Sequence, residues 1–341
     1  MKRIINLFLI LLLMLNGCGA TVHTDKIDNV AQDEGIKIGM SFDSFVIERW
    51  QKDRDVFVST AKDYGAAVNI QNANGDLEEQ INQIEYFIKQ KVDVIVIICI
   101  DSNGLTNVVK KAKDAGIKVV AYDRMINDAD IDLYISFDNE KVGELMAKAL
   151  LNPEKKDQKV LMLCGPLTDN NVNLVQEGFK KIMDENNVEI LDVMYAEGWK
   201  AELAGSYIYE NIDKVMKADG IMCGNDNMAT MVVHALAEKQ LAGKIDVVGQ
   251  DGDLEACQRI VEGTQKMTVY KPVEKLAKEA AIYSIRLAKG ESLEELETVA
   301  SGNYEIPYCL LPPQSVNKQN IDELIESGVH LKEDVYLNIP Y

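Results

Sequence analysis

The chain has 341 residues, of which 47% are hydrophobic and 27% are charged, and its formal net charge at pH 7 is -19. This length suggests about two domains at roughly 150 residues each, and the composition is that of a protein with a large buried core. The acidic charge argues against nucleic-acid binding, which needs a basic surface, and against electrostatic adhesion to anionic lipids.

The first residues have the features of an export signal. A short basic start precedes an apolar run over 4–15, which falls short of the roughly 20 residues that a membrane-spanning helix needs. The run ends in Leu15-Asn16-Gly17-Cys18, which resembles a bacterial lipobox; a plain secretory signal with an incidental cysteine is the alternative. We therefore expect a lipoprotein signal peptide over 1–18 and a flexible tether over 19–35. The protein would then be extracytoplasmic, anchored to the outer face of the cell membrane by a lipidated Cys18.

From Ile36 onward, short apolar strands alternate with amphipathic helices. In the first half, the pattern predicts strands at 37–40, 67–70 and 92–100, and helices over 46–64, 77–89 and 108–115. The same alternation restarts at Val160 and continues through 188–191, Ile221 and Val247. Strands that alternate with helices in this way are typical of parallel sheets with helices on both faces. We therefore predict an α/β protein made of two doubly wound, mostly parallel lobes.

No low-complexity linker separates the two halves, so we expect the chain to pass between the lobes several times. The predicted crossings lie near Asp138, near Tyr270-Lys271 and near Pro307-Tyr308, which gives a three-stranded hinge. This assigns 36–138 plus 271–306 to the N-terminal lobe and 139–270 plus 307–341 to the C-terminal lobe.

Five of the apolar strands run directly into small clusters of polar side chains. In open α/β sheets, ligands bind at the carboxyl ends of the strands. The clusters supply carboxylates, amides and charged donors that suit a ligand with many hydroxyl groups, and tryptophan rings can cover the apolar face of a sugar. We therefore predict a sugar-binding cleft between the lobes. Its candidate residues are Arg49, Trp50, Asp123, Arg124, Asp169, Asn171, Trp199, Asn225, Asp251 and Lys271.

Several of these residues also have a purely structural interpretation. Arg49 lies in a charge-rich helix start, where most charges are expected on a solvated face, and we expect replacement of Asp53 there to have little effect. Trp50 could belong to the core, Asp123-Arg124 could form a structural ion pair, and Asn225 could cap a helix. The convergence of strand ends, rather than any one residue, supports a binding site.

Enzyme functions find little support in the sequence. The histidines His23, His234 and His330 form no plausible base or metal set, and no CxxC pair or Cys/His cluster indicates zinc. No G-x-G-x-x-G follows a strand, which argues against a dinucleotide-dependent dehydrogenase. We expect no catalytic residue, no cofactor and no metal. The five cysteines after Cys18 leave open whether any disulfide forms.

Long stretches of 36–320 resemble the type I periplasmic sugar-binding proteins, and among them the members that bind D-xylose. These stretches are 48–55, 107–110, 121–132, 136–143, 249–251 and 267–272. The resemblance implies that the sugar is held by Arg49, Asp123, Arg124, Asp169, Asn171, Asn225, Asp251 and Lys271, with Trp199 packed on its ring.

The resemblance also implies the type I periplasmic-binding-protein fold and a role in transport. The protein would capture an aldopentose, D-xylose, by hinge closure and deliver it to the membrane permease of an ABC transporter. A membrane sensor histidine kinase that responds to xylose is the alternative partner. Residues 44–47 and 226–233 depart from the family pattern, which leaves glucose and arabinose open as ligands.

Overall fold

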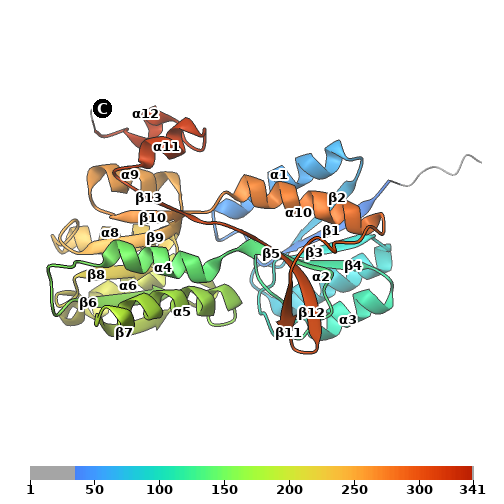
Figure 1. Cartoon of the computed structure of the whole chain (residues 1–341), viewed down its shortest axis with the longest axis horizontal. Helices are drawn as coiled ribbons and strands as arrows, with labels where there is room; N and C mark the ends of the chain where they lie inside the picture. The colour runs from blue at the N-terminus through green and yellow to red at the C-terminus, as the bar shows by residue number, and fades with distance from the viewer. Residues whose placement is uncertain (1–34, 340–341) are drawn as a thin grey trace, which may run out of the picture. The chain divides into compact units, whose positions relative to one another are not determined.

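The computed structural model describes residues 35–339, which form two α/β lobes (Figure 1). The predicted signal peptide, Cys18 and all but the last residue of the predicted tether lie outside this range. Within 35–339, no helix is long and apolar enough to cross a membrane. The predicted fold class, two α/β lobes with mostly parallel sheets, is confirmed.

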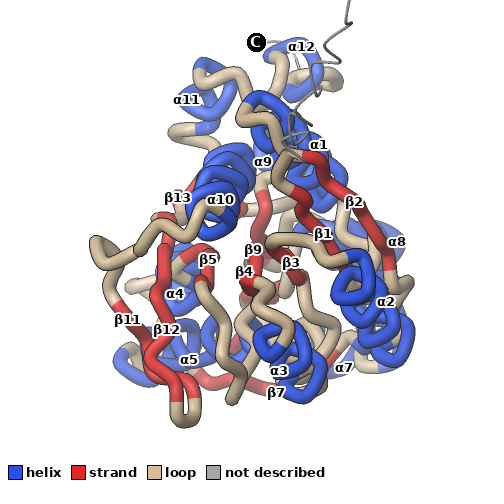
Figure 2. The backbone as a smooth tube through the Cα atoms, turned by 90° about the vertical axis from the view of Figure 1, so that its right-hand side faces the viewer, coloured by secondary structure: helices blue, strands red, loops and turns tan. Residues whose placement is uncertain are grey.

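The N-terminal lobe is built on a seven-stranded sheet with the order β11-β12-β5-β4-β3-β1-β2. Its strands are β1 (Lys37–Phe42), β2 (Ala67–Asn72), β3 (Val94–Ile97), β4 (Lys118–Tyr122), β5 (Leu133–Phe137), β11 (Thr298–Ser301) and β12 (Tyr304–Leu311). Strand β11 pairs antiparallel with β12, and the other neighbours pair in parallel. Helices α1 (Arg49–Asp63) and α10 (Val273–Ala288) cover one face, and α2 (Leu77–Gln90) and α3 (Thr106–Asp114) cover the other (Figure 2). The central strand β3 is therefore buried on both faces.

The C-terminal lobe is built on a six-stranded sheet with the order β13-β10-β9-β8-β6-β7. Its strands are β6 (Lys159–Cys164), β7 (Glu189–Tyr195), β8 (Gly220–Cys223), β9 (Asp246–Asp251), β10 (Met267–Tyr270) and β13 (Gln314–Asn317). Helices α4 (Asn139–Leu150) and α5 (Asn170–Glu185) pack together on one face, and α6 (Ala201–Glu210), α8 (Asp226–Glu238) and α9 (Leu254–Glu262) lie on the other. The shorter elements are η1 (Glu197–Trp199), α7 (Ile212–Val215), α11 (Ile321–Glu326) and α12 (Lys332–Val335), the last of which packs on α9.

Helices α4 and α5 approach each other closely because each has a glycine at the contact. A Cβ atom on Gly143 would lie 2.0 Å from the carbonyl oxygen of Val175, and one on Gly178 would lie 1.9 Å from that of Glu140. Any larger residue would force the helices apart. The close approach matters for the site described below, because Asn139 and Asn171 lie in the first turns of these two helices.

The chain passes between the two sheets three times, after β5, after β10 and after β12. The prediction placed the third crossing near Pro307-Tyr308, but β12 continues to Leu311, and the chain crosses at 312–313. Residues Tyr304–Pro307 pair with β11, whereas Tyr308–Leu311 pair with β5. Pro307 therefore pairs with β11 but not with β5. Because no hydrogen bond to β5 is required of it, the strand can continue through a residue that has no N–H group.

The cysteines of the described chain are all free. Cys99, Cys164, Cys223 and Cys257 are buried, and Cys309 is half-buried. Burial raises the pKa of the Cys164 thiol to about 12. At neutral pH these buried thiols therefore behave as small apolar side chains.

Candidate functional site

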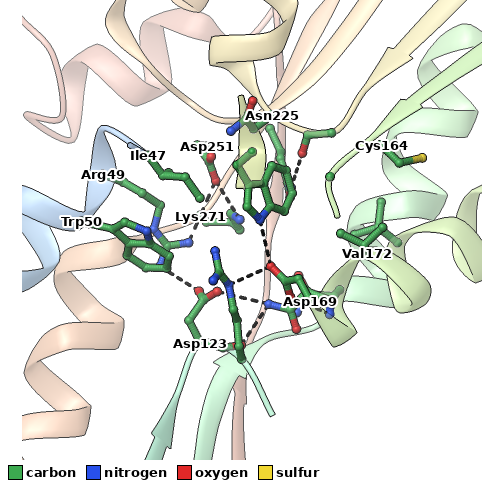
Figure 3. Close-up of a pocket in the computed structure, with 18 of the residues that line it drawn as sticks. Ile47, Arg49, Trp50, Asp123, Cys164, Asp169, Val172, Asn225, Asp251 and Lys271 are labelled. Carbon is green, nitrogen blue, oxygen red and sulfur yellow. Dashed lines mark hydrogen bonds and ion pairs between the residues drawn. The ribbon is translucent and has the colours of Figure 1, made fainter. Parts of the chain in front are cut away.

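A cavity lies between the lobes and is lined by all ten residues that the sequence singles out. Figure 3 shows the two walls, with Arg49, Trp50 and Asp123 on one side and Asp169 and Val172 on the other. Each of the ten residues is buried, with at most 9% of its surface exposed. The cavity thus collects strand ends from both sheets into one site.

The strand-to-helix turns explain how these side chains reach the cavity. Asp169 follows β6 and is the N-cap of α5, where its side chain accepts a hydrogen bond from the backbone N–H of Asn171. Asn225 follows β8 and caps α8 by accepting from the N–H of Met228. The structural interpretation of Asn225 as a helix cap is therefore correct, yet the residue also lines the cavity, and its amide nitrogen has no hydrogen-bond partner among residues 35–339. One side chain can serve both roles because its two polar atoms point in different directions.

Arg49 is held by two carboxylates of its own lobe. Its Nη2 donates to Asp53 at 3.0 Å and to Asp123 at 2.8 Å, and its guanidinium lies 4.4 Å from the centre of the Trp50 ring. Burial is the largest influence on the pKa of Asp123 and acts to raise it. The cations Arg49, Lys271 and Arg124 together outweigh burial and lower that pKa. Asp123 is therefore ionised at neutral pH.

The expectation that Asp53 lies on a solvated face is wrong. Asp53 is fully buried, accepts two hydrogen bonds from Arg49 and accepts a third from the hydroxyl of Tyr122. The buried positions of α1 are Arg49, Trp50, Asp53, Phe57 and Ala61, which recur mainly at four-residue spacing. Four-residue spacing places residues on one helix face, and here that face packs against the sheet.

Arg124 and Asp169 join the two lobes directly. The Nε of Arg124 lies 2.7 Å from a carboxylate oxygen of Asp169, while its Nη1 donates to Asp43 at 2.8 Å and to the carbonyl of Cys99 at 3.0 Å. A second link is made by Asn171, whose amide nitrogen donates to the backbone and side-chain oxygens of Asp123 at 3.0 Å and 3.1 Å. Asp123 and Arg124 therefore form ion pairs with other residues rather than with each other.

Trp199 forms a flat wall of the cavity on the C-terminal lobe. A Cβ atom on Gly165 would lie 2.4 Å from the Trp199 ring, and one on Gly224 would lie 3.2 Å from it, so both positions need glycine to let the ring approach. The indole Nε1 donates to Asp169 at 3.2 Å, which fixes the ring plane. The Trp50 ring packs against the guanidinium groups of Arg49 and Arg124 and also lines the cavity. Trp50 therefore belongs both to the core and to the cavity lining.

Asp251, which the sequence singles out, has an unusual backbone conformation. Its φ is 106°, in a region that non-glycine residues rarely adopt, and its carboxylate lies 2.7 Å from the ammonium of Lys271. The turn that follows is anchored by Asp226, whose carboxylate accepts from the N–H groups of Gly252 and Asp253 at 3.0 Å and 3.1 Å. Such strain persists only where the surroundings hold it, and Asp226 provides that support.

Several buried polar atoms around the cavity have no hydrogen-bond partner within residues 35–339. They include the donors Arg124 Nη2 and Asn225 Nδ2 and the acceptor Gln250 Oε1. Buried polar atoms without partners are rare in proteins, and those that occur need an explanation. Donors and acceptors gathered on one cavity suit a ligand whose groups can both donate and accept, as hydroxyl groups do.

Sequence reasoning missed some lining residues. Gln250 lines the cavity and donates to the carbonyl of Gly224 at 2.5 Å; its place at the end of an apolar strand, beside Asp251, was a usable signal. The apolar lining residues Ile47, Val172, Val175 and Met222 carried no such signal, because in sequence they cannot be distinguished from core positions.

Comparisons with known proteins agree with the resemblance seen in the sequence. A family model described as periplasmic binding protein domain matches residues 38–292. The chain is 44% identical over 313 residues to the D-xylose-binding periplasmic protein of Haemophilus influenzae, covering 90% of this chain and 94% of that protein. It is 45% identical over 312 residues to the D-xylose-binding periplasmic protein of Escherichia coli, covering 89% and 94%.

A solved structure shares the fold over nearly its whole length. The carbohydrate transporter solute binding protein from Chloroflexus aurantiacus, in complex with D-glucose, has a TM-score of 0.80 and 25% sequence identity. The match covers 87% of this chain and 97% of that one. An ABC transporter solute binding protein from Clostridium phytofermentans with bound β-D-glucose has a TM-score of 0.78 and 26% identity, covering 88% and 99%.

Proposed function

The chain belongs to the periplasmic binding protein family, and from this premise we propose that it captures an aldopentose, D-xylose, between its two lobes. The family is one of binding proteins rather than enzymes, so no catalytic step is assigned. The observation that carries the proposal is the set of buried, unpartnered donors and acceptors around the cavity, together with relatives of 44% and 45% identity that are named for D-xylose.

The charges of the cavity support a neutral ligand. The charged residues in the lining are three cations, Arg49, Arg124 and Lys271, and three carboxylates, Asp123, Asp169 and Asp251. These cations and carboxylates pair with one another. A charged ligand would therefore lie beside a buried group of its own charge, which is unfavourable. A neutral polyhydroxyl ligand can instead accept from the cations and donate to the carboxylates.

We assign the ligand contacts to both lobes. Arg49, Trp50, Asp123 and Arg124 belong to the N-terminal lobe, Asp169, Asn171, Trp199, Asn225 and Asp251 belong to the C-terminal lobe, and Lys271 lies at the second crossing. A sugar that contacts both sets stabilises the closed arrangement of the lobes over an open one. Trp199 and Trp50 offer the apolar surfaces that the C–H faces of a pyranose require.

Isothermal calorimetry with D-xylose, D-glucose, L-arabinose and D-ribose tests this function. We expect tight binding of D-xylose and much weaker binding of the others, because a missing or misplaced hydroxyl leaves a buried polar group unpaired. Tight binding of another sugar in the panel would keep the sugar site but overturn the assignment to D-xylose. Absence of heat with all four sugars would contradict the proposal.

We further propose that the protein is held at the outer face of the membrane by a lipid on Cys18 and delivers its sugar to an ABC transporter. The anchor rests on the lipobox-like sequence that ends at Cys18, which lies outside the described residues. Delivery to a transporter, rather than signalling to a sensor kinase, is favoured because structural neighbours are named as transporter solute binding proteins. We expect Cys18→Ser to move the protein from the membrane fraction to the soluble fraction, as followed by immunoblotting; an unchanged membrane fraction would contradict the anchor.

A further inference from the structure

A polar contact joins the lobes outside the cavity. It is made by Ser102, in the loop that follows β3, and by the start of α5 on the other lobe. The backbone N–H of Ser102 donates to the carbonyl of Thr168 at 2.9 Å, and the Ser102 hydroxyl accepts from the N–H of Asn170 at 3.0 Å. Ser102 is 2% exposed, and neither it nor its two partners line the cavity. The contact is therefore made by groups that do not line the cavity, and its two partners flank Asp169, which does.

The Ser102 loop is braced within its own lobe. The carbonyl of Ser102 accepts from the N–H of Asn127 at 2.7 Å, and the side chain of Asn127 donates to Asn103 at 3.0 Å. The N–H of Ile100 donates to the side chain of Gln80 at 2.9 Å. These bonds involve residues of the N-terminal lobe alone, so the loop keeps its shape whether or not the lobes are together.

The partner of the Ser102 hydroxyl is an N–H group that α5 itself cannot satisfy. The first N–H groups of an α-helix have no carbonyl partner within the helix. Asp169, the N-cap, accepts from Asn171, and the N–H of Asn170 is satisfied by Ser102 from the opposite lobe. When the lobes separate, this N–H group must bond to water instead.

We propose that Ser102 is a positioning residue for closure, which holds the two lobes together beside the ligand without contacting it. This inference rests on the proposed function, because closure matters through the sugar that it encloses. Opening the lobes breaks both bonds of Ser102 whatever the cavity contains. Ser102 thus slows the release of every sugar by the same factor and has no part in the choice between sugars.

Stopped-flow measurement of sugar dissociation, followed by tryptophan fluorescence, tests the role of Ser102. We expect Ser102→Ala to raise the dissociation rate of D-xylose about 10-fold, because it removes one hydrogen bond and leaves the N–H of Asn170 without a partner in the closed state. The same factor is expected for any second sugar that the wild-type protein binds. Within its own lobe the Ser102 hydroxyl contacts the sulfur of Cys99 at 4.0 Å, which is a weak hydrogen bond, and the other bonds that brace the loop involve its backbone and other side chains. The thermal midpoint without sugar should therefore stay near that of the wild type.

Ser301→Ala is the matched control. Ser301 is also buried, and its hydroxyl accepts from the N–H of Asp128 at 3.1 Å, but both residues lie in the N-terminal lobe. We expect D-xylose to dissociate from the Ser301→Ala variant at the same rate as from the wild type. An unchanged rate in Ser102→Ala, or different factors for two sugars, would overturn the inference.

A failure of the proposed function is distinguishable from a failure of this inference. If the wild-type protein binds no sugar of the panel, small-angle X-ray scattering of the unliganded proteins still tests the contact. Ser102→Ala should then be more open than the wild type and Ser301→Ala. Superimposable scattering curves for the three proteins would overturn the role of Ser102 in closure.

Discussion

Replacement of Arg124 by alanine is expected to weaken the binding of D-xylose about 1000-fold, equivalent to about 4 kcal/mol. Arg124 has a free Nη2 at the cavity and is paired with Asp43 on its own lobe and with Asp169 on the other. Alanine therefore removes a donor to the sugar and a direct link between the lobes at once. It also leaves two buried carboxylates without their cation, which opposes closure further.

Calorimetry with D-xylose measures this loss, and circular dichroism verifies that the variant is folded. Arg124→Lys keeps the charge but not the planar fork, so we expect it to recover only part of the affinity. Arg286→Ala is the matched control, because Arg286 lies in the same lobe and pairs with Glu291 and Glu295 at the surface. A folded Arg124→Ala protein whose affinity equals that of Arg286→Ala would remove Arg124 from the site.

The fold could be predicted because each lobe repeats a strong physical pattern. Strands such as β3, with all four residues buried, read as continuous apolar runs, and the helices between them show apolar stripes. The third crossing lies beyond its predicted place near Pro307-Tyr308, because β12 continues through the proline to Leu311. A strand can include Pro307 only if no hydrogen bond from its backbone nitrogen to a neighbouring strand is needed. This depends on which residues of β12 pair with β5, and those two strands are far apart in sequence.

Most of the polar cavity-lining residues could be predicted because they follow strands, and parallel strands bring their carboxyl ends to one edge of a sheet. What the sequence left open was the pairing of the charges with one another. An ion pair between Arg124 and its neighbour Asp123 was one structural interpretation, whereas the partners of Arg124 are Asp43 and Asp169, which come from two other strand ends. Asp169 is brought to Arg124 by the approach of the two lobes, and Asp43 by the order of the strands within one sheet, and no local pattern records either of them.

Asp53 is the residue whose role the sequence most misjudged, although a signal was present. In a charge-rich helix start, a buried carboxylate and a solvated one look alike. The distinction lies in the spacing: Asp53 is four residues from both Arg49 and Phe57, so all three share the face that packs on the sheet. A charged residue in phase with an apolar stripe is thus a better candidate for a buried network than for solvent.

We therefore expect Asp53→Ala to lower the free energy of unfolding by about 3 to 5 kcal/mol, because it leaves the buried guanidinium of Arg49 with one carboxylate fewer. It also removes the acceptor of the Tyr122 hydroxyl. Since Asp53 holds Arg49 through both Nε and Nη2, the affinity for D-xylose should fall as well, by at least about 10-fold. Denaturant unfolding and calorimetry measure the two effects.

Asp55→Ala provides the control for this prediction within the same helix. Asp55 is two residues further on, 68% of its side chain is exposed, and its ion pair with Arg54 lies at the surface. Surface ion pairs contribute at most about 1 kcal/mol, so neither stability nor affinity should change measurably. If Asp53→Ala behaved like Asp55→Ala, Asp53 would not be needed to hold Arg49, and the other carboxylates near its guanidinium, Asp123 and Asp251, would be sufficient.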